Sequence, residues 1–488
     1  MSRQITIEPV TRIEGHAKIT LRLDDAGKLE SARFHVNEFR GFEKFCEGRL
    51  FHEMPLITER ICGICPVSHH LTSAKAGDAI LGVQPPRPAQ LLRELMHLGQ
   101  TIQSHAMHFF MLAGPDLILG PDSNPALRNV AGLYQADPQL TVKAIRLRKF
   151  GQEIIERLGE RKVHPNFAIP GGVNKALTVV DRDAILAGVP EMQGIVRDGL
   201  GILKGWAEKN ADEMRGFAVF STGYLGMVDE NDAVQLYDGE LRLVDSKRKQ
   251  LERFNGADYL DFIAEHVEPW SYLKFPYYRR LGWPAGTYRV GPLGRLNAAT
   301  RLATPLAQHE YVQFQQAAGG NVVEGSLYYH YARLIELMYA LERVQHILAD
   351  PDILSKDLRT TAGINHREGI GILEAPRGTL IHHYWVDENG LLEKVNLIVA
   401  TGHNNYAMSR GVEEVARRTF PGGTVTEGML NRVEMVIRAY DPCLSCSTHA
   451  AGQMPLLVEV RGPKNELLEQ HQRPAPAVSS PAPTANRP

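Results

Sequence analysis

The chain has 488 residues, of which 43% are hydrophobic and 23% are charged, the composition of an ordinary globular protein. Its formal net charge of -2 gives no electrostatic reason for nucleic acid to bind, so we expect no nucleic-acid partner. Five cysteines are too few for a disulfide framework, and no stretch approaches the roughly 18 apolar residues of a membrane span, so we expect a reducing compartment and no direct membrane insertion.

The first residues alternate apolar and polar side chains and predict a β-hairpin with strands over residues 4–22 and 29–36. The charged cluster Thr11-Arg12-Ile13-Glu14-Gly15-His16 interrupts the first strand. From the residues alone, a solvated strand end explains this cluster better than a functional site. A helix is predicted over residues 38–59, where Cys46 has no cysteine partner at metal-binding spacing and fits a buried, inert thiol.

The first Cys-x-x-Cys pair, Cys62 and Cys65, follows that helix. Two intervening residues let both sulfurs turn toward one point, as a soft metal requires. The chain then enters another predicted helix, in which His69 lies four residues after Cys65. One helical turn would bring His69 over that sulfur, where it could donate a hydrogen bond.

Stretches with helical periodicity predict a buried helical core in the middle of the chain: residues 89–113, 140–160, 182–216 and 325–349. His105 and His108 lie three residues apart on the first of them, and a core position explains them better than metal ligation. Residues 199–205 superficially resemble a nucleotide-binding fingerprint. Their spacing is wrong for it, however, and no strand is predicted before them.

A second β-hairpin is predicted over residues 369–386 and 391–400. Its first strand contains Glu374-Ala375-Pro376-Arg377-Gly378, and a proline within a strand marks an edge or a bulge. A bulge would aim Arg377 at a specific target, whereas the alternative is an ordinary surface arginine. The residues alone do not separate these two interpretations.

Two further predicted helices, over residues 406–419 and 428–440, lead to the second Cys-x-x-Cys pair, Cys443 and Cys446. One pair alone could be a redox dithiol, but two pairs that use four of the five cysteines indicate one four-thiolate metal site. Structural zinc is the alternative. Zinc ribbons usually close a loop of about 15–20 residues, and these pairs lie near opposite ends of the chain, so a catalytic soft-metal site is favoured.

Together these motifs resemble the [NiFe]-hydrogenase large subunit. The family's two signatures correspond to Arg60-Ile61-Cys62-Gly63-Ile64-Cys65 and Asp441-Pro442-Cys443-Leu444-Ser445-Cys446-Ser447-Thr448-His449. Further stretches match in the family's order: Arg12-Ile13-Glu14-Gly15-His16, Arg40-Gly41-Phe42-Glu43, His164-Pro165 and Ala375-Pro376-Arg377-Gly378. The continuation Pro66-Val67-Ser68-His69-His70 is most similar to the NAD-reducing, bidirectional, cytoplasmic group.

The resemblance implies a mainly α (α+β) fold, a large buried helical bundle with peripheral β-hairpins. One catalytic domain would span residues 1–449, with an N-terminal hairpin region at 4–37, the bundle in the centre and a hairpin at 369–400. Residues 450–488 would be a C-terminal extension. A maturation endopeptidase would cut between His449 and Ala450 once metallochaperones have loaded the metal.

The resemblance also implies the ligands of the metal site. All four cysteines would bind nickel, with Cys62 and Cys443 as terminal ligands. Cys65 and Cys446 would also bridge to an iron that carries one CO and two cyanides, giving a Ni-Fe(CN)2(CO) centre.

At such a centre H2 is split heterolytically. The resemblance implies that the proton passes first to Cys443 or Arg377 and then to Glu14, which carries it outward. It also places His69, Pro376 and Asp441 around the ligands.

A magnesium ion is implied near the second signature. Glu43 and His449 would help to bind it, which suits a hard cation, and the backbone carbonyl of Leu397 would complete the site.

The chain has one cysteine beyond the four expected ligands, so it cannot hold an iron–sulfur cluster of its own. The resemblance therefore implies a hetero-oligomer: a small subunit with Fe-S clusters, and diaphorase subunits with FMN that pass electrons to NAD+ (H2 + NAD+ = NADH + H+). A cytoplasmic location is expected.

One residue departs from the family pattern. Many relatives have an aspartate where Ser104 stands, and a serine cannot pair with Arg377 as a charge. Three alternatives stay open: a hydrogenase linked to F420, NADP or a quinone, a respiratory-complex subunit that has lost its metal, and a non-catalytic zinc or iron thiolate protein.

Overall fold

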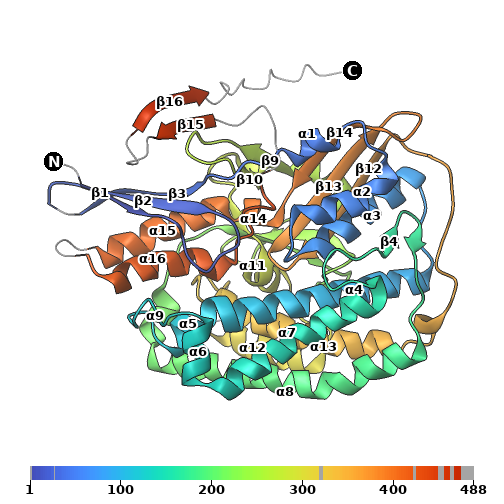
Figure 1. The fold of residues 1–488 in the computed structure, drawn as a ribbon, viewed down its shortest axis with the longest axis horizontal. Coiled ribbons are helices and arrows are strands. Elements are labelled where there is room, and N and C mark those ends of the chain that lie inside the picture. Colours follow the sequence, from blue (N-terminus) through green and yellow to red (C-terminus); the bar gives the residue numbers. More distant parts are fainter. Residues whose placement is uncertain are drawn as a thin grey trace.

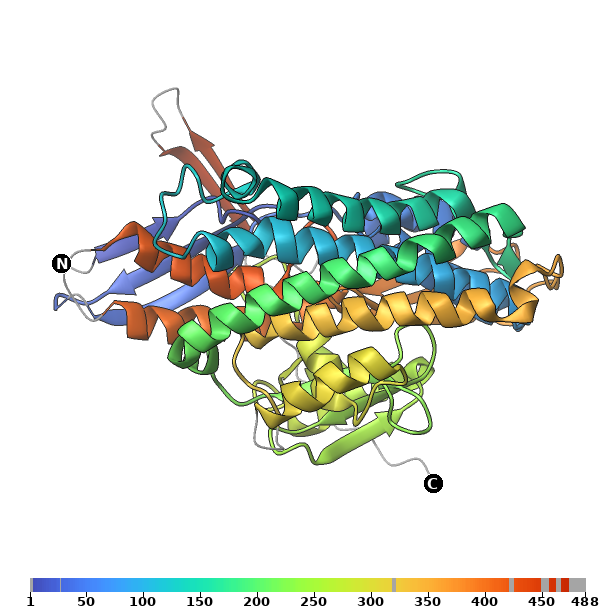
Figure 2. The same ribbon diagram turned by 90° about the horizontal axis from the view of Figure 1, so that it is seen from below.

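The computed structural model describes residues 3–26, 28–317, 322–420, 425–448, 456–461 and 467–473. Four long helices form its centre: α4 (Arg87–Met107), α7 (Pro138–Gly159), α8 (Val179–Lys209) and α13 (Tyr328–Ala349). Contacts run from α4 to α7, α7 to α8, α8 to α13 and α13 back to α4, so the helices close into a bundle (Figure 1, Figure 2). The predicted helical core is confirmed.

The bundle forms because its helices carry more than one apolar stripe. In α13, Leu334, Ile335 and Leu337 are all fully buried although they point in different directions around the helix. His105 and His108 are also fully buried, as the predicted core position requires. Residues 199–205 lie inside α8, which excludes a nucleotide-binding loop there.

The N-terminal strands form an antiparallel sheet of β1 (Arg3–Ile7), β2 (Ala17–Leu23) and β3 (Leu29–Val36). The predicted hairpin is present as β2 and β3. The expectation of one continuous first strand over 4–22 is wrong, because the chain leaves the sheet at the charged cluster, where Arg12 has a φ of 57°.

The predicted helix over 38–59 is also wrong as a single element. The segment contains α1 (Phe42–Cys46), a 3-10 turn (Phe51–Glu53), α2 (Met54–Thr58) and a second 3-10 turn (Glu59–Ile61). Pro55 lies in the first turn of α2, because its ring is tolerated at a helix start and cannot continue a preceding helix. After the first cysteine pair, α3 (Pro66–Leu81) is the helix that the sequence predicts.

The second sheet consists of β12 (Glu368–Ala375), β13 (Gly378–Val386) and β14 (Leu392–Ile398), all antiparallel, and α3 packs against it. The hairpin of β13 and β14 was predicted. Pro376 and Arg377, however, form the turn between β12 and β13, so the predicted bulge inside a strand is wrong. A turn suits proline because no ladder hydrogen bond is lost there.

A four-stranded sheet lies on one side of the bundle (Figure 2), in the order β11 (Tyr288–Arg289), β6 (Gly223–Val228), β7 (Glu240–Val244), β8 (Gln250–Phe254). Helix α11 (Gly291–Ala298) contacts both β6 and α13, and α12 (Pro305–Gln316) contacts α13. The predicted C-terminal helices are α15 (Asn405–Thr419), which contacts β3, and α16 (Glu427–Tyr440).

The remaining elements are short: α5 (Gly114–Ile118), α6 (Val130–Ala136), α9 (Ala211–Gly216), α10 (Tyr259–Phe262), α14 (Ala400–His403), β4 (Ala168–Ile169), β5 (Gly172–Val173), β9 (Ile263–His266), β10 (Phe275–Tyr278), β15 (Leu456–Arg461), β16 (Leu467–Arg473) and a π-helical turn (His108–Ala113).

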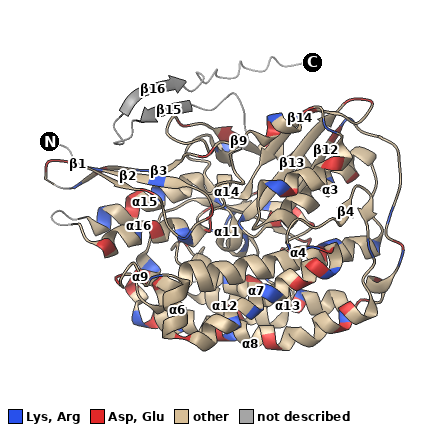
Figure 3. Ribbon diagram, in the orientation of Figure 1, with Lys and Arg blue, Asp and Glu red and all other residues tan. Residues whose placement is uncertain are grey.

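Acidic and basic residues are interspersed over the helices in Figure 3. In the part of the chain that the structure describes, no helix has the length and apolar character needed to span a membrane.

Candidate metal centre

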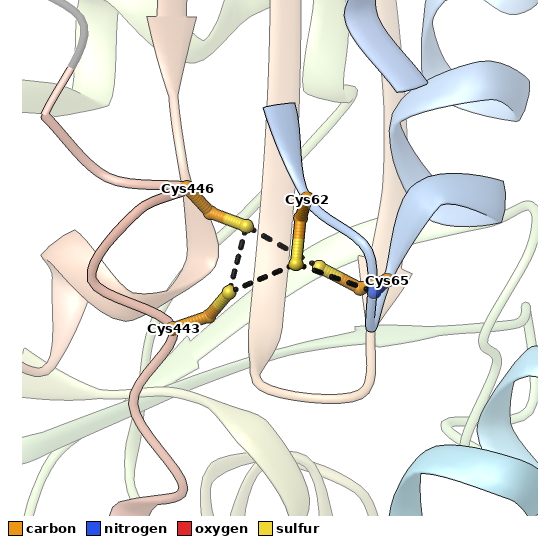
Figure 4. Close-up of side chains that lie close together, drawn as sticks. All are labelled: Cys62, Cys65, Cys443 and Cys446. Atoms are coloured by element: carbon orange, nitrogen blue, oxygen red, sulfur yellow. Dashed lines mark hydrogen bonds between the residues drawn. The ribbon is translucent and has the colours of Figure 1, made fainter. Parts of the chain in front are cut away.

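The two Cys-x-x-Cys pairs lie on loops that face each other (Figure 4). Cys65 is the residue before the first turn of α3, which Pro66 opens with a fixed φ that suits a helix start. Asp441 ends α16 in a left-handed conformation, with a φ of 54°, and turns the chain toward Cys443. The two helix ends thus bring sulfurs from opposite ends of the sequence together.

The four sulfurs form one cage. Sγ of Cys62 lies 3.3 Å from that of Cys443, Sγ of Cys65 lies 3.4 Å from that of Cys446, and the sulfurs of Cys443 and Cys446 are 2.8 Å apart across the second loop. All four sulfurs lie within 4.8 Å of one another and are buried. Sulfurs on one metal ion at about 2.3 Å are at most about 4.6 Å apart, so the cage fits a soft metal.

Electrostatics support the same conclusion. Hydrogen bonds from the other thiols, that of Cys443 first, lower the pKa of Cys62 well below its usual range. Burial raises the pKa of Cys443 and of Cys446. One thiolate is therefore favoured in the cage, whereas four thiolates can coexist in so apolar a place only around a cation.

Arg377 is buried beside the cage, so it is not an ordinary surface arginine. Its Nε donates to the Asp441 carbonyl at 2.6 Å and its Nη2 donates to Asp441 Oδ1 at 3.1 Å. Burial opposes its charge, but Asp441 and the Cys443 sulfur raise the pKa of Arg377 so that it stays cationic. Arg377 Nη1 and Asp441 Oδ2 have no hydrogen-bond partner among the described residues, so each can still meet a bound group.

The charged cluster of the first sheet reaches the second cysteine loop, so a solvated strand end is the wrong interpretation. Glu14 forms a parallel β-bridge with Cys443, and its carbonyl accepts from Leu444 N at 3.2 Å. Its carboxylate Oε2 accepts from Ser445 N at 3.1 Å. Gly15 has a φ of 85°, and a Cβ there would lie 2.8 Å from Leu444 Cβ, so only glycine lets the loops approach this closely.

The polar side chains beyond Glu14 carry no signal in the sequence that would predict them. Ser445 Oγ donates to Glu38 Oε2 at 3.1 Å, and Glu38 Oε1 lies 2.6 Å from His16 Nδ1. His16 is 80% exposed, so the hydrogen bonds of Ser445 Oγ, Glu38 and His16 lead from the residue whose backbone N–H binds Glu14 to the surface. His16 belongs to the charged cluster of residues 11–16, but no spacing in the sequence joins it to Glu38.

His69 is fully buried and lines the same cavity as Cys65, Cys446 and Arg377, so it lies close to the Cys65 sulfur, while its hydrogen bond to that sulfur stays a prediction. Its Nδ1 lies 3.0 Å from Nε2 of His382, which sequence analysis did not single out. Burial lowers the pKa of His69 to about 4, so its ring is neutral at physiological pH.

The cavity has further lining residues that the sequence did not predict. Thr401 Oγ accepts from Cys443 N at 2.9 Å, which leaves the hydroxyl hydrogen free to donate elsewhere. Ser68 Oγ lines the same cavity and has no hydrogen-bond partner in the described part of the chain. The apolar wall consists of Ala375, Leu380, Val399 and Ala400.

Glu43 lies at a second, separate cavity, which Leu397 and Ser447 also line. Glu43 Oε1 accepts from the Leu397 backbone N–H at 2.8 Å, and burial raises the pKa of this carboxyl. Lys274 and Glu265 line the same cavity and pair at 2.9 Å. His449 and Ala450 lie outside the described residues.

Two residues play no part in the cage. Cys46 is fully buried, and burial raises the pKa of its thiol to about 12, which confirms the predicted inert thiol. Ser104 is also fully buried, and its hydroxyl has no hydrogen-bond partner among the residues that the structure covers.

Two family models match the chain. One is described as nickel-dependent hydrogenase and matches residues 40–129 and 224–449; the other is described as HoxL-like and matches residues 4–39. Together they contain both cysteine pairs, Glu14, Glu43 and Arg377.

Individual relatives are similar over most of their length. NAD-reducing hydrogenase HoxS subunit beta of Cupriavidus necator is 44% identical over 97% of this chain and 100% of its own. One subunit of the F420-non-reducing hydrogenase vhu of Methanococcus voltae is 43% identical over 86% of this chain and 99% of its own. Among solved structures, an NAD+-reducing [NiFe]-hydrogenase in the H2-reduced state is similar with a TM-score of 0.89 and 43% identity, covering 92% of this chain and 99% of that one.

Proposed function

This chain belongs to the nickel-dependent hydrogenases and has their large-subunit fold, and we propose that it couples H2 oxidation to the reduction of NAD+ through partner subunits. The observation that carries the proposal is the buried cage of four thiols, in a chain that is 44% identical to an NAD-reducing hydrogenase subunit. The chain is thus an oxidoreductase, and the proposal concerns its centre, its proton route and its electron acceptor.

Cys62, Cys65, Cys443 and Cys446 would hold nickel, with Cys65 and Cys446 also binding an iron that carries CO and cyanide. When bound, such a centre supplies the electrophile that polarises H2 for heterolytic cleavage. Cys65, Cys443 and Cys446 line the cavity beside Arg377, so a group bound in this cavity would lie next to three of the four sulfurs. The apolar wall suits CO, while Thr401 and Arg377 offer hydrogen-bond donors to cyanide.

The proton of H2 would leave through this chain's own side chains. Arg377 stays cationic and so cannot accept a proton, which leaves Cys443 to take it first. Glu14 would accept it next, since the Glu14 backbone is bridged to Cys443. From Glu14 the route would continue past Ser445 to Glu38 and His16. The hydrogen bonds of 3.1 Å and 2.6 Å between these three groups and the exposure of His16 support this direction.

A magnesium ion would sit at the cavity beside Glu43, with His449 and the backbone of Leu397 as further ligands. The buried Glu43 carboxyl supports this site, because it lines a cavity together with Leu397 and Ser447 and carboxylate oxygen is the ligand that a hard cation prefers. His69, Pro376 and Asp441 would hold the cage and Arg377 in place around the Ni–Fe centre.

Electrons would leave through a small subunit with Fe-S clusters and through diaphorase subunits with FMN, because this chain has one cysteine beyond its cage. The relatives' names, as subunits, support such an assembly. A cytoplasmic location fits NAD+ as acceptor. Residues 1–449 would form the mature catalytic domain, and an endopeptidase would remove 450–488 after the metallochaperones have acted.

A second candidate function keeps the same H2 chemistry with another acceptor. The F420-non-reducing relative is almost as similar as the NAD-reducing one, at 43% identity, and supports this alternative. The acceptor is then a property of the partner subunits rather than of the cage.

One experiment tests the proposal on the complex purified from its native host. We expect one nickel per chain with iron in excess of nickel, because the Fe-S clusters of the partner subunits add iron. We also expect H2-dependent reduction of NAD+ and a large-subunit mass that ends at His449. Activity with methyl viologen but not with NAD+ would favour the second candidate. Zinc in place of nickel would contradict both, and an active chain that retains residues 450–488 would contradict the processing step.

A further inference from the structure

The turn that presents Arg377 to the cage is only two residues long, between the end of β12 at Ala375 and the start of β13 at Gly378. Its guanidinium binds Asp441 at the end of α16. The position of the guanidinium therefore depends on whatever fixes the backbone of this turn. Helix α11 contacts β13 and lies against the turn from outside the cage.

Arg295, on α11, is almost completely buried and uses all five of its N–H groups. Nη1 donates to Glu374 Oε2 at 2.8 Å and to the Ala375 carbonyl at 2.9 Å. Nη2 donates to the Pro376 carbonyl at 3.3 Å. One guanidinium thus binds three successive residues that lead directly into Arg377.

The same guanidinium is anchored to the helical bundle. Its Nε and Nη2 each lie 2.6 Å from a carboxylate oxygen of Glu336 on α13. Glu336 Oε2 also lies 2.9 Å from His105 Nε2 on α4. Burial alone would raise the pKa of Glu336, but Arg295 beside it brings it down to about 2, so the pair is ionised and bidentate.

A second contact between α11 and the turn lies one helical turn earlier, on the same face as Arg295. Gly291 has a φ of 80°, and a Cβ placed there would lie 2.9 Å from the Arg377 carbonyl oxygen. Only a residue without a side chain lets the start of α11 touch Arg377 this closely. Gly291 and Arg295 therefore hold the turn from both of its ends.

We propose that α11 positions Arg377 at the metal cage, with Gly291 and Arg295 as positioning residues that act through the backbone of the turn. This inference rests on the proposed function, since it takes Arg377 to act at the cage. Lysine cannot replace the planar guanidinium, because a single ammonium cannot reach Glu336, Glu374 and two carbonyls at once. A change at either residue should move Arg377 while the four cysteines keep their places.

The first test compares Arg295→Lys with Arg289→Lys in the intact complex. Arg289 is equally buried and binds Thr222, Phe220 and Glu324, none of which belongs to the turn. We expect similar losses of thermal stability in both variants. Both variants should keep their nickel. Only Arg295→Lys should also lose at least tenfold in H2 oxidation and shift the cyanide bands of the infrared spectrum.

The second test displaces the turn by a steric clash, whereas the first removes contacts that hold it. It still tests the proposal if Arg295→Lys does not fold. Gly291→Ala places a methyl group against the Arg377 carbonyl. Gly282→Ala is the matched control, because Gly282 has a φ of 71° but no atom within 4 Å of the place where its Cβ would lie. Both substitutions strain the backbone similarly, and only Gly291→Ala should shift the cyanide bands and lower turnover.

The proposal predicts that the effects share one cause. In an Arg377→Lys background, Arg295→Lys should lower turnover further by less than twofold, because the group that it positions is already replaced. The proposal would be overturned if Arg295→Lys lowered turnover by the same factor in the Arg377→Lys background as in the wild type. Unshifted cyanide bands in both Arg295→Lys and Gly291→Ala would also overturn it. Wild-type complex without nickel or cyanide bands would instead overturn the proposed function, so the two failures are distinguishable.

Discussion

Glu14 and Cys443 come from opposite ends of the sequence and form a parallel β-bridge at the metal cage. The contact requires the N-terminal loop to leave its sheet, and polar contacts hold it there: Arg12 Nη2 lies 2.6 Å from Asp116 Oδ1, and Thr11 Oγ donates to Glu434 at 2.9 Å. The carboxyl group of Glu14 is thereby fixed beside a metal-binding loop, which is the arrangement that outward proton transfer needs.

Replacing Glu14 should separate proton transfer from metal binding. Glu14→Gln keeps a side-chain oxygen that can accept from Ser445 N but cannot carry a proton. We expect nickel content to stay unchanged while exchange between D2 and solvent protons falls about 100-fold or more. Glu8→Gln, at an exposed position of the same loop, should exchange normally. Normal exchange in Glu14→Gln would move the proton route elsewhere.

The cysteines offer a matched comparison within one chain. Cys446→Ser removes a sulfur from the cage, so we expect loss of nickel and of all H2 oxidation. Cys46→Ser changes a thiol that is equally buried but lies outside the cage, and it should keep its metals at a cost of about 1 kcal/mol in stability. Metal analysis of both variants measures the difference. A fully active Cys446→Ser variant would refute its assignment as a ligand.

Arg377 should act through the geometry of its guanidinium as well as its charge. Arg377→Lys keeps the charge but loses the fork that binds Asp441 twice, so we expect at least a tenfold drop in H2 oxidation with nickel retained. Arg367→Lys, on an exposed arginine near the start of β12, serves as the control. Equal turnover in the two variants would contradict a role for the fork.

Glu59 should make stability depend on pH. Burial raises the pKa of this carboxyl to about 8, above its ordinary value of 4.5, so the folded protein holds the proton more tightly than the unfolded chain. The resulting stabilisation is complete below about pH 4.5 and is lost as the pH rises through about 8. The melting temperature of the wild type should therefore fall between pH 5 and 8 relative to Glu59→Gln.

An exposed neighbour provides the control for this pH dependence. Glu53→Gln changes a solvated carboxyl on the same segment, and its melting curve should run parallel to that of the wild type. If the melting temperature of Glu59→Gln also changed with pH in parallel with that of the wild type, the prediction that Glu59 has a raised pKa in the folded protein would be contradicted.

Local patterns predicted the helices and the cage ligands but not the contacts between distant segments. The helices of the bundle follow from a 3.6-residue apolar period, and both cysteine pairs follow from their spacing. No local pattern joins Ser445 to Glu38, or Thr401 to Cys443, because these contacts depend on how loops meet in three dimensions.

The wrong expectations have the same origin. Alternation predicted one strand through Arg12, but its tertiary ion pair with Asp116 draws that loop into the core. Pro376 was expected in a strand, whereas Arg295 holds it in a turn through backbone carbonyls that carry no signal in the sequence.

The infrared spectrum of the purified complex, recorded under argon and then under H2, tests the central claim most directly. If the four thiols hold a Ni–Fe centre, the spectrum should contain one CO band and two cyanide bands, and all three should shift when H2 is admitted. A spectrum without these bands, from protein that has been shown to be folded and assembled with its small subunit, would contradict the account.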